Sequence, residues 1–155
     1  MKGRNRLILC SMVLGIIGAC NPDRIFEEYQ GMASLSWVAE DTVSFEVEAV
    51  DPNASISSIG VRYNETYEFH NLYVRYLLTD SVGNHLVDSL INVHLFDSKT
   101  GRPLGRGFGN VYTVYDTLPQ FDTRSVERAK AHFIQYMRKD ELEGIEAVGL
   151  KIKRK

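Results

Sequence analysis

Apolar and polar residues alternate along several segments of this 155-residue chain. The clearest case is the segment 42–49, where Val43, Phe45 and Val47 are separated by polar residues. Because successive side chains of a strand point to opposite faces of its sheet, this pattern predicts a half-buried strand with one solvated face.

Four more segments are predicted to be strands. They are residues 56–63, 72–78, 86–96 and 148–152. The segment 86–96 is apolar on both sides towards its end, which is typical of a central strand. Turn residues separate the segments, with Asp51-Pro52-Asn53-Ala54 before the first of them and a hairpin loop predicted at 80–84.

Other segments are less regular. In 126–137 the apolar residues fit either one face of a helix or alternate positions of a strand. We favour the strand, because the rest of the chain is β and its strands need partners. Residues 140–145 are predicted to form a turn or a single helical turn. The glycine-rich segment 97–110 is expected to form no regular element, since glycine permits many backbone conformations with positive φ.

Together these segments predict an all-β fold. We expect a single antiparallel β-sandwich, jelly-roll-like and of seven or eight strands, behind an N-terminal lipoprotein signal peptide. Its core is expected to combine apolar residues from several strands. They are Phe45, Val47, Val74, Val93, Leu95, Phe133, Leu150 and Ile152.

The N-terminal residues have the composition of a secretory signal peptide. Basic residues within 2–6 precede an apolar run from Leu7 to Ala19. The run is too short for a helix that spans a bilayer, which needs about 20 residues. The tetrapeptide Ile17-Gly18-Ala19-Cys20 resembles the bacterial lipobox, in which the cysteine thiol is acylated and the peptide bond before it is cut. Cys20 is therefore predicted to be the lipid attachment site.

The alternatives to lipid attachment are an ordinary signal peptide with an incidental cysteine and an uncleaved anchor. With Cys20 as the attachment site, residues 1–19 are the cleaved lipoprotein signal peptide. Residues 20–36 are then a lipidated tether, and 37–155 are the β-sandwich domain. The protein would be held in the cell envelope by its lipid, since several acyl chains anchor a protein stably.

Charge and cysteine content narrow the range of partners. The chain has 18 basic and 20 acidic residues. Three basic residues and none of the acidic ones lie in the predicted leader, so the mature protein is mildly acidic, which argues against nucleic acid as a partner. Cys10 would leave with the leader and Cys20 would carry lipid. The mature protein is then expected to have no thiol for a disulfide, a metal site or a nucleophile.

Sequence patterns that would indicate catalysis or a cofactor are weak. Gly105, Gly107 and Gly109 lack the spacing of a phosphate-binding loop, and no Gly-Lys-Ser/Thr follows them. The four histidines are not spaced as metal ligands, and no Gly-x-Ser-x-Gly motif indicates a serine hydrolase. A pair of carboxylates acting as in glycosidases is an alternative, but no spacing selects one pair. We expect a non-enzymatic protein without catalytic residues, metal or cofactor.

Two features are candidates for binding. The first is a group of aromatic residues, namely Tyr63, Tyr67, Phe69, Tyr73 and Tyr76. They would either stack on sugars or be ordinary half-buried strand residues. The second is the loop 101–109, which carries Leu104 and Phe108. These two side chains would either anchor a protein partner or fold back to cap the open end of the sandwich.

Several segments together resemble the gliding-motility lipoprotein family GldH. They are the lipobox Cys20, residues 26–29, Trp37 before Asp41, and residues 43–45, 71–73, 101–109 and 137–150. The last segment, Met137 to Leu150, is the most specific. The order of these segments within one small lipoprotein strengthens the resemblance.

The resemblance implies a non-enzymatic accessory lipoprotein of the cell envelope, needed for gliding motility and linked to the associated type IX protein secretion. Only Cys20 carries over as a functional residue, as the site of lipid (palmitate) attachment. The implied partners are the membrane, through this lipid, and proteins of the gliding and secretion machinery. An envelope-tethered carbohydrate-binding module is the alternative function. Since residues 21–24 lack the crowded acidic residues of surface-exported lipoproteins, we expect the protein to face the periplasm.

Overall fold

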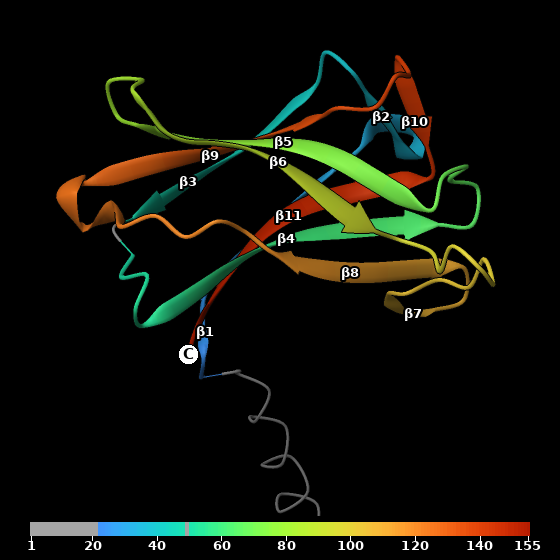
Figure 1. Ribbon diagram of the computed structural model, residues 1–155, viewed down its shortest axis with the longest axis horizontal. Coiled ribbons are helices and arrows are strands. Elements are labelled where there is room, and N and C mark those ends of the chain that lie inside the picture. Colours follow the sequence, from blue (N-terminus) through green and yellow to red (C-terminus); the bar gives the residue numbers. More distant parts are fainter. Residues whose placement is uncertain (1–21, 49) are drawn as a thin grey trace, which may run out of the picture.

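The computed structural model describes residues 22–48 and 50–155. Within them two antiparallel sheets pack face to face, and a small two-stranded sheet closes one end (Figure 1). The strands are β1 (Arg24–Gly31), β2 (Ser36–Val38), β3 (Thr42–Glu48), β4 (Ser55–Asn64), β5 (Asn71–Asp80), β6 (His85–His94), β7 (Arg106–Phe108), β8 (Val111–Thr117), β9 (Arg128–Gln135), β10 (Glu141–Glu143) and β11 (Ile145–Arg154). Two single turns of 3-10 helix are η1 (Ala33–Leu35) and η2 (Thr123–Ser125).

The two large sheets have different strand orders. The five-stranded sheet has the order β1-β11-β4-β8-β7, and the four-stranded sheet has the order β3-β9-β5-β6. β2 and β10 form the small sheet. The prediction of an all-β antiparallel sandwich is confirmed.

The core lies between the two large sheets. All the core residues predicted from the sequence are buried, and they belong to one cluster. Phe133 of β9 is fully buried, and its ring stacks on that of Tyr76 with a centroid distance of 5.5 Å. The ring of Phe45 lies 6.1 Å from it on the other side. The alternating apolar residues thus bury one face of each sheet, as expected for a sandwich.

Residues 126–137 contain a strand, as predicted, and not a helix. β9 lies between β3 and β5, with Phe133 opposite Val43 on one neighbour and opposite Tyr76 on the other. Alternate residues of β9 are buried, which is the period of a strand. This segment is a strand and not a helix because it pairs with both β3 and β5.

The number of strands differs from the prediction. The described residues contain eleven strands rather than seven or eight. Three of the additional strands, β2, β7 and β10, have three residues each, which is too short for a visible alternation. β10 pairs with β2 where a turn or a single helical turn was expected. β7 pairs with β8 and lies inside the glycine-rich segment that was expected to have no regular element.

β6 is an edge strand and not the central strand that its composition predicts. It pairs with β5 alone, and Leu90 on its outer face is 54% exposed. Val93 on the other face is fully buried in the core. The outer face of β6 therefore carries apolar residues although no further layer covers it.

β1 belongs to the sandwich, which corrects the boundary predicted for the tether. The segment 20–36 was expected to be a tether, but β1 pairs with β11 from Arg24 opposite Lys153 to Gly31 opposite Ala147. The folded domain therefore begins near Arg24 rather than at residue 37. The predicted signal peptide 1–19 and Cys20 lie outside the described residues and stay predictions. In residues 22–48 and 50–155 no helix has the length and hydropathy needed to cross a membrane.

Candidate functional site

The glycine-rich segment 97–110 runs from β6 to the outer edge of the five-stranded sheet, where it forms β7 (Figure 1). Its first turn is held by Asp97, whose carboxylate accepts hydrogen bonds from the backbone N–H of Thr100 (2.7 Å) and of Lys99 (3.1 Å). These bonds, that from Thr100 above all, lower the pKa of Asp97. Gly101 closes the turn with a φ of +68°. The segment therefore begins as a fixed turn.

Tyr63 of β4 ties the middle of this segment to the core. Its hydroxyl donates a hydrogen bond to the carbonyl of Leu95 (2.5 Å) and accepts one from the backbone N–H of Gly105 (3.0 Å). The ring is fully buried, and burial raises the pKa of this hydroxyl. Phe96 packs edge-on against the same ring, with a centroid distance of 5.2 Å. The loop is thus attached to the sandwich at a buried residue.

Two glycines allow the loop to lie against β8. A Cβ at Gly105 would lie 2.8 Å from the carbonyl oxygen of Thr113, and one at Gly107 would lie 2.8 Å from the Cα of Tyr112. Both distances are too short for a side chain without movement of the backbone. These glycines therefore serve close packing, and they lead into strands β7 and β8 rather than into the helix that a phosphate-binding loop requires.

Apolar and basic side chains project from this rigid edge. Phe108 is 96% exposed and Leu104 is 50% exposed. Arg102 and Arg106 are exposed, and neither forms an ion pair with any residue that the structure describes. β7 is the outermost strand of its sheet, so its second edge has no strand partner within the described fold.

This geometry decides between the two interpretations of Leu104 and Phe108. Phe108 does not fold back to cap the sandwich, because an almost fully exposed ring buries nothing, and Leu104 leaves half of its surface exposed. The edge instead combines an aromatic side chain, an aliphatic side chain and two arginines on one fixed segment. Arginine is among the residues enriched at the energetically dominant positions of protein interfaces, an exposed aromatic ring has a large apolar area to bury, and unpaired strand edges accept added strands. We call residues 102–108 the exposed edge.

The aromatic group near β4 and β5 is mostly structural. Tyr63, Tyr67 and Tyr76 are buried, and burial raises the pKa of Tyr76 to about 12. Tyr63 and Tyr76 are strand residues, and Tyr67 lies in the loop between β4 and β5, so none of these three buried rings is available to stack on a sugar. Phe69 is partly buried and Tyr73 is 38% exposed. The five rings therefore do not form one continuous platform.

Tyr73 has an aromatic neighbour that the sequence analysis missed. Tyr136, which follows β9, is 60% exposed and donates its backbone N–H to the carbonyl of Tyr73 at 2.8 Å. Both rings line an open cleft of about 570 Å³ together with Phe69, Met137, Arg138 and Lys139. The alternation along β9 could have revealed Tyr136, since it continues the outward face of Ile134.

His132 forms a second polar cluster that sequence spacing did not reveal. Its Nδ1 lies 2.8 Å from the hydroxyl of Ser44, and its Nε2 lies 3.2 Å from that of Thr79. Both partners that the structure describes for this ring are hydroxyl groups, whereas a catalytic triad places a carboxylate on one of the two nitrogens. Burial lowers the pKa of His132. The described residues contain no group of three histidine, cysteine or acidic side chains that could hold a metal ion.

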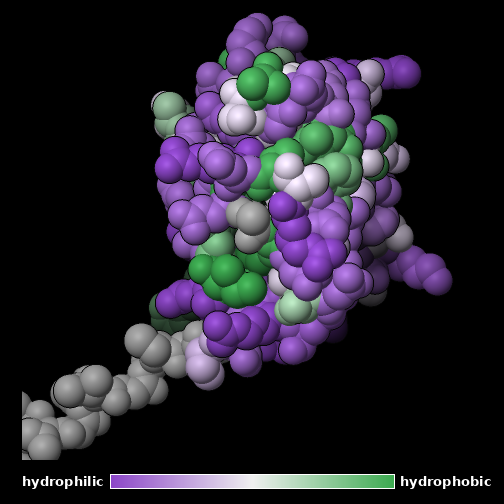
Figure 2. All heavy atoms as spheres, turned by 90° about the vertical axis from the view of Figure 1, so that its left-hand side faces the viewer, coloured by the Kyte–Doolittle hydropathy of each residue, from purple (hydrophilic) through white to green (hydrophobic). Residues whose placement is uncertain are grey.

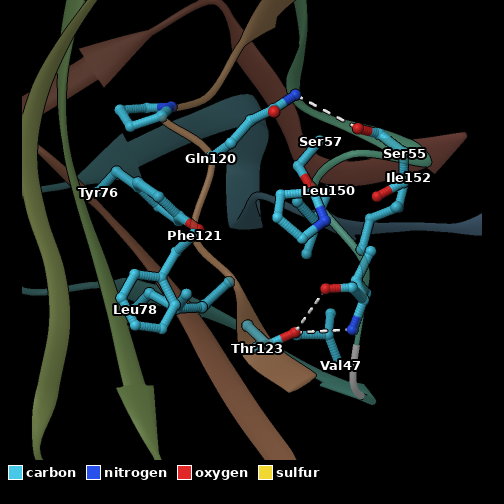
Figure 3. A pocket seen from close by; sticks show the side chains of 14 residues that line it. Val47, Ser55, Ser57, Tyr76, Leu78, Gln120, Phe121, Thr123, Leu150 and Ile152 are labelled. Atoms are coloured by element: carbon cyan, nitrogen blue, oxygen red, sulfur yellow. Dashed lines mark hydrogen bonds between the residues drawn. The ribbon is translucent and has the colours of Figure 1, made fainter. Parts of the chain in front are cut away.

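A small cavity lies between the two large sheets, lined by side chains of β3, β4, β5, β9 and β11 and of residues 119–123 (Figure 3). It measures about 30 Å³, which is room for a water molecule and not for an organic ligand. The Thr123 hydroxyl helps to close it, accepting from the N–H of Val50 at 2.7 Å, and the Gln120 amide donates to the carbonyl of Ser55 at 3.3 Å. Figure 2 shows this side of the molecule as mainly hydrophilic, with apolar side chains in separate small patches. The cavity is a feature of packing.

Comparison with known proteins identifies the family. Residues 24–152 match the sequence profile of the GldH lipoprotein family, from the start of β1 to nearly the end of β11. The chain belongs to the GldH lipoprotein family. The resemblance inferred from the sequence is thereby confirmed. A curated relative, the gliding motility lipoprotein GldH of Flavobacterium johnsoniae, is 25% identical over 166 residues, which cover 100% of this chain and 98% of the relative.

Solved structures are similar only in part. The arabinose-bound α-L-arabinofuranosidase MgGH51 matches with a TM-score of 0.40 and 9% identity, over 81% of this chain and 23% of the enzyme. The VP2 subviral particle of infectious bursal disease virus matches with a TM-score of 0.40 and 12% identity, over 88% of this chain and 36% of VP2.

Proposed function

We propose that this GldH-family protein is a non-enzymatic accessory protein of the cell envelope. It is attached to the membrane by lipid on Cys20, faces the periplasm, and supports gliding motility and the associated type IX protein secretion. It acts through contacts with other proteins of that machinery. Membership of the GldH lipoprotein family supports the envelope role, and the name of the Flavobacterium relative supports the link with gliding.

The exposed edge is the observation that carries the protein-contact part of this proposal. An aromatic ring that is 96% exposed gains nothing for folding, because it leaves its apolar area in water. Phe108 is nevertheless presented on a segment that the Asp97 turn and the Tyr63 hydroxyl hold in place. A preorganised anchor loses little conformational entropy when a partner binds. Two arginines beside Phe108 make an acidic surface on the partner the electrostatic match.

A charge reversal tests the exposed edge in cells. Arg102→Glu combined with Arg106→Glu should abolish or strongly reduce secretion, and motility where the host glides, with an unchanged melting temperature. A matched control reverses Arg128 and Lys130, two exposed residues of β9 without ion pairs in the described fold. The control should secrete as the wild type does at equal stability, because the new glutamates opposite Glu48 and Glu46 weaken the β3–β9 pairing without touching the exposed edge. A wild-type phenotype for the Arg102 and Arg106 double variant would show that the exposed edge is not the partner surface.

Carbohydrate binding is the second candidate function, and the cleft beside Tyr73 and Tyr136 favours it. Two neighbouring exposed rings can stack on sugar faces, and Arg138 and Lys139 at the rim offer hydrogen-bond donors. The purified protein would then bind peptidoglycan or an envelope polysaccharide. Tyr136→Ala should abolish this binding, whereas Phe108→Ala should leave it unchanged. Absence of binding in the wild-type protein would exclude this candidate.

A further inference from the structure

The first two described residues, Pro22 and Asp23, are bonded to Arg154 at the end of β11. The carbonyl of Asp23 accepts a hydrogen bond from the backbone N–H of Arg154 at 2.7 Å. The carbonyl of Pro22 accepts one from the Arg154 guanidinium at 3.2 Å. Arg24 lies opposite Lys153 in the β1–β11 pairing. Figure 1 shows both ends of the fold at the same edge of the molecule, opposite the small sheet of β2 and β10.

This arrangement restricts where a lipid on Cys20 can be. Cys20 is two residues before Pro22, and consecutive Cα atoms are 3.8 Å apart, so the two Cα atoms are at most about 8 Å apart. The covalent link therefore limits how far an acyl group on Cys20 can be from Pro22, whose carbonyl contacts Arg154. The folded domain cannot move far from the membrane, because β1 begins almost directly after the anchor.

Basic side chains gather at this end of the domain. Lys153, Arg154 and Lys155 are consecutive and exposed. None of the three forms an ion pair with a residue that the structure describes. Lys155 donates its ammonium N–H to the carbonyl of Pro52 at 2.8 Å, which brings the turn 51–54 beside them.

The acidic residues near this end offset only part of its positive charge. Asp51 and Asp122 share Arg124, at 3.4 and 2.6 Å, and Glu27 pairs with Arg24 at 3.1 Å. Together with Asp23 these four acidic residues are one fewer than the basic residues at this end, which are Arg24, Arg124, Lys153, Arg154 and Lys155. The surface beside the anchor thus has a local excess of positive charge, although the whole chain has a net charge of −2.

We propose that this end of the domain docks on anionic lipid headgroups. We call Lys153, Arg154, Lys155 and the turn 51–54 the docking end. This inference rests on the proposed lipid attachment at Cys20. Attraction between basic residues and an anionic membrane falls off within a Debye length, about 8 Å at physiological ionic strength. The short link to Cys20 keeps these side chains within that range, so the lipid anchor and the basic residues act together.

Docking in this way gives the domain one orientation. The small sheet of β2 and β10 points away from the membrane, because it lies at the opposite end of the fold (Figure 1). β7 lies at the side of the molecule and stays open to a partner. An accessory protein that is oriented in this way presents the same surface to its machinery in every copy.

Site-specific quenching tests the orientation in the full lipidated protein. Since Cys10 would leave with the leader and Cys20 would carry lipid, an introduced cysteine is the only free thiol. Fluorophores are placed at Asn53→Cys in the docking end and at Glu141→Cys on β10. The protein is reconstituted in phosphatidylcholine vesicles with or without phosphatidylglycerol, both containing a headgroup-labelled quencher lipid. The Asn53 probe should be quenched several-fold more than the Glu141 probe, and only with phosphatidylglycerol at low salt.

A charge-reversal pair provides the matched control. Lys153→Glu with Lys155→Glu should remove the phosphatidylglycerol-dependent quenching at Asn53. Lys99→Glu with Arg106→Glu, which makes the same change of net charge in the glycine-rich segment, should leave it intact. Equal quenching at Asn53 and Glu141, or quenching independent of phosphatidylglycerol, would overturn the docking while the anchored protein still floats with vesicles. Failure of the wild-type protein to incorporate labelled palmitate and to float would overturn the lipid attachment and the docking together.

Discussion

The ring of Tyr29 lies flat against Gly149, its cross-strand neighbour, on the outer face of the five-stranded sheet. A Cβ at Gly149 would lie 2.6 Å from Cδ1 of Tyr29 and 2.7 Å from the carbonyl oxygen of Glu28. Gly60 on β4 continues this flat surface, and the Arg62 guanidinium lies 5.1 Å from the centre of the Tyr29 ring. Burial raises the pKa of Tyr29 well above its ordinary value. Side-chain packing thus joins β1 to the sheet in addition to the backbone pairing.

Gly149→Ala should destabilise the protein by about 1–3 kcal/mol, as overpacking usually does, because the new methyl group collides with the Tyr29 ring and the backbone of β1. Urea unfolding of the purified protein measures this change. Gly31→Ala is the control, since a Cβ there meets nothing nearer than 3.9 Å. Equal stability of the two variants would contradict the packing of β1 described here.

Phe133→Ala should lower the free energy of unfolding by about 3–5 kcal/mol, because it leaves a cavity between the two sheets. Phe133 is fully buried and contacts the rings of Tyr76 and Phe45. Thermal unfolding monitored by circular dichroism provides the measurement. Ile134→Ala, on the outward face of the same strand, should cost much less. Similar losses for both variants would mean that β9 does not separate the core from solvent as the structure shows.

The pKa of His132 makes stability depend on pH in a defined window. Burial lowers this pKa below its ordinary value of 6.5, so the unfolded chain binds more protons between the two values. The contribution of His132 is therefore fully present above about pH 6.5 and is lost as the pH falls through the window below it. The melting temperature of the wild type should fall across that window.

Variants show whether His132 causes this decrease in melting temperature. His132→Gln should show a smaller decrease in melting temperature over the same range, whereas His94→Gln, at an exposed position, should decrease as the wild type does. An NMR titration of His132 should give a pKa below 6.5. A His132 pKa above that value would contradict the burial of its ring between Ser44 and Thr79.

Local alternation predicts the long strands and fails for the elements that depend on distant partners. The segments at β3, β5 and β11 alternate or are uniformly β-forming, and their buried faces follow from sequence. β2 and β10 are three residues each and exist because they pair with one another across a large separation along the chain. The prediction for β6 also failed because it depended on a distant partner. Apolar residues on both faces of a strand do not tell whether another strand pairs with its outer edge.

The candidate site shows a similar limit. The glycine spacing and the apolar residues of 101–109 mark the loop, but they fit both an exposed and a folded-back Phe108. The structure decides for an exposed Phe108, which is 96% accessible, on a loop that the Tyr63 hydroxyl fixes at Gly105 from a strand that is distant in sequence. The contact of Ser44 with His132 likewise joins two strands, β3 and β9, whose pairing no local pattern reveals.

Cys20→Ser should leave an unprocessed precursor that takes up no labelled palmitate, because serine offers no thiol for acylation before the leader is cut. Metabolic labelling and gel mobility measure both properties. Cys10→Ser, inside the predicted leader, is the control and should mature normally. Normal maturation and labelling of Cys20→Ser would exclude this residue as the attachment site.

Tyr63→Phe should loosen the exposed edge without removing it. The substitution leaves the Gly105 N–H without the Tyr63 hydroxyl as acceptor, whereas the Leu95 carbonyl still accepts from the Leu104 N–H at 2.8 Å. An unsatisfied buried polar group typically costs about 1–3 kcal/mol. Amide hydrogen exchange at Gly105 should become faster, while exchange in the centre of β9 changes little. Tyr67→Phe, which loses a single bond to the carbonyl of Asn71, is the matched control and should leave exchange at Gly105 unchanged.

The same variant connects the buried hydroxyl with function. If a preordered exposed edge is what the partner recognises, Tyr63→Phe should reduce secretion more than its loss of stability accounts for, because the partner must then pay the entropy of ordering Phe108. Tyr67→Phe, compared at equal stability, should secrete as the wild type does. Faster exchange at Gly105 together with wild-type secretion would show that the order of this edge is not what the partner reads.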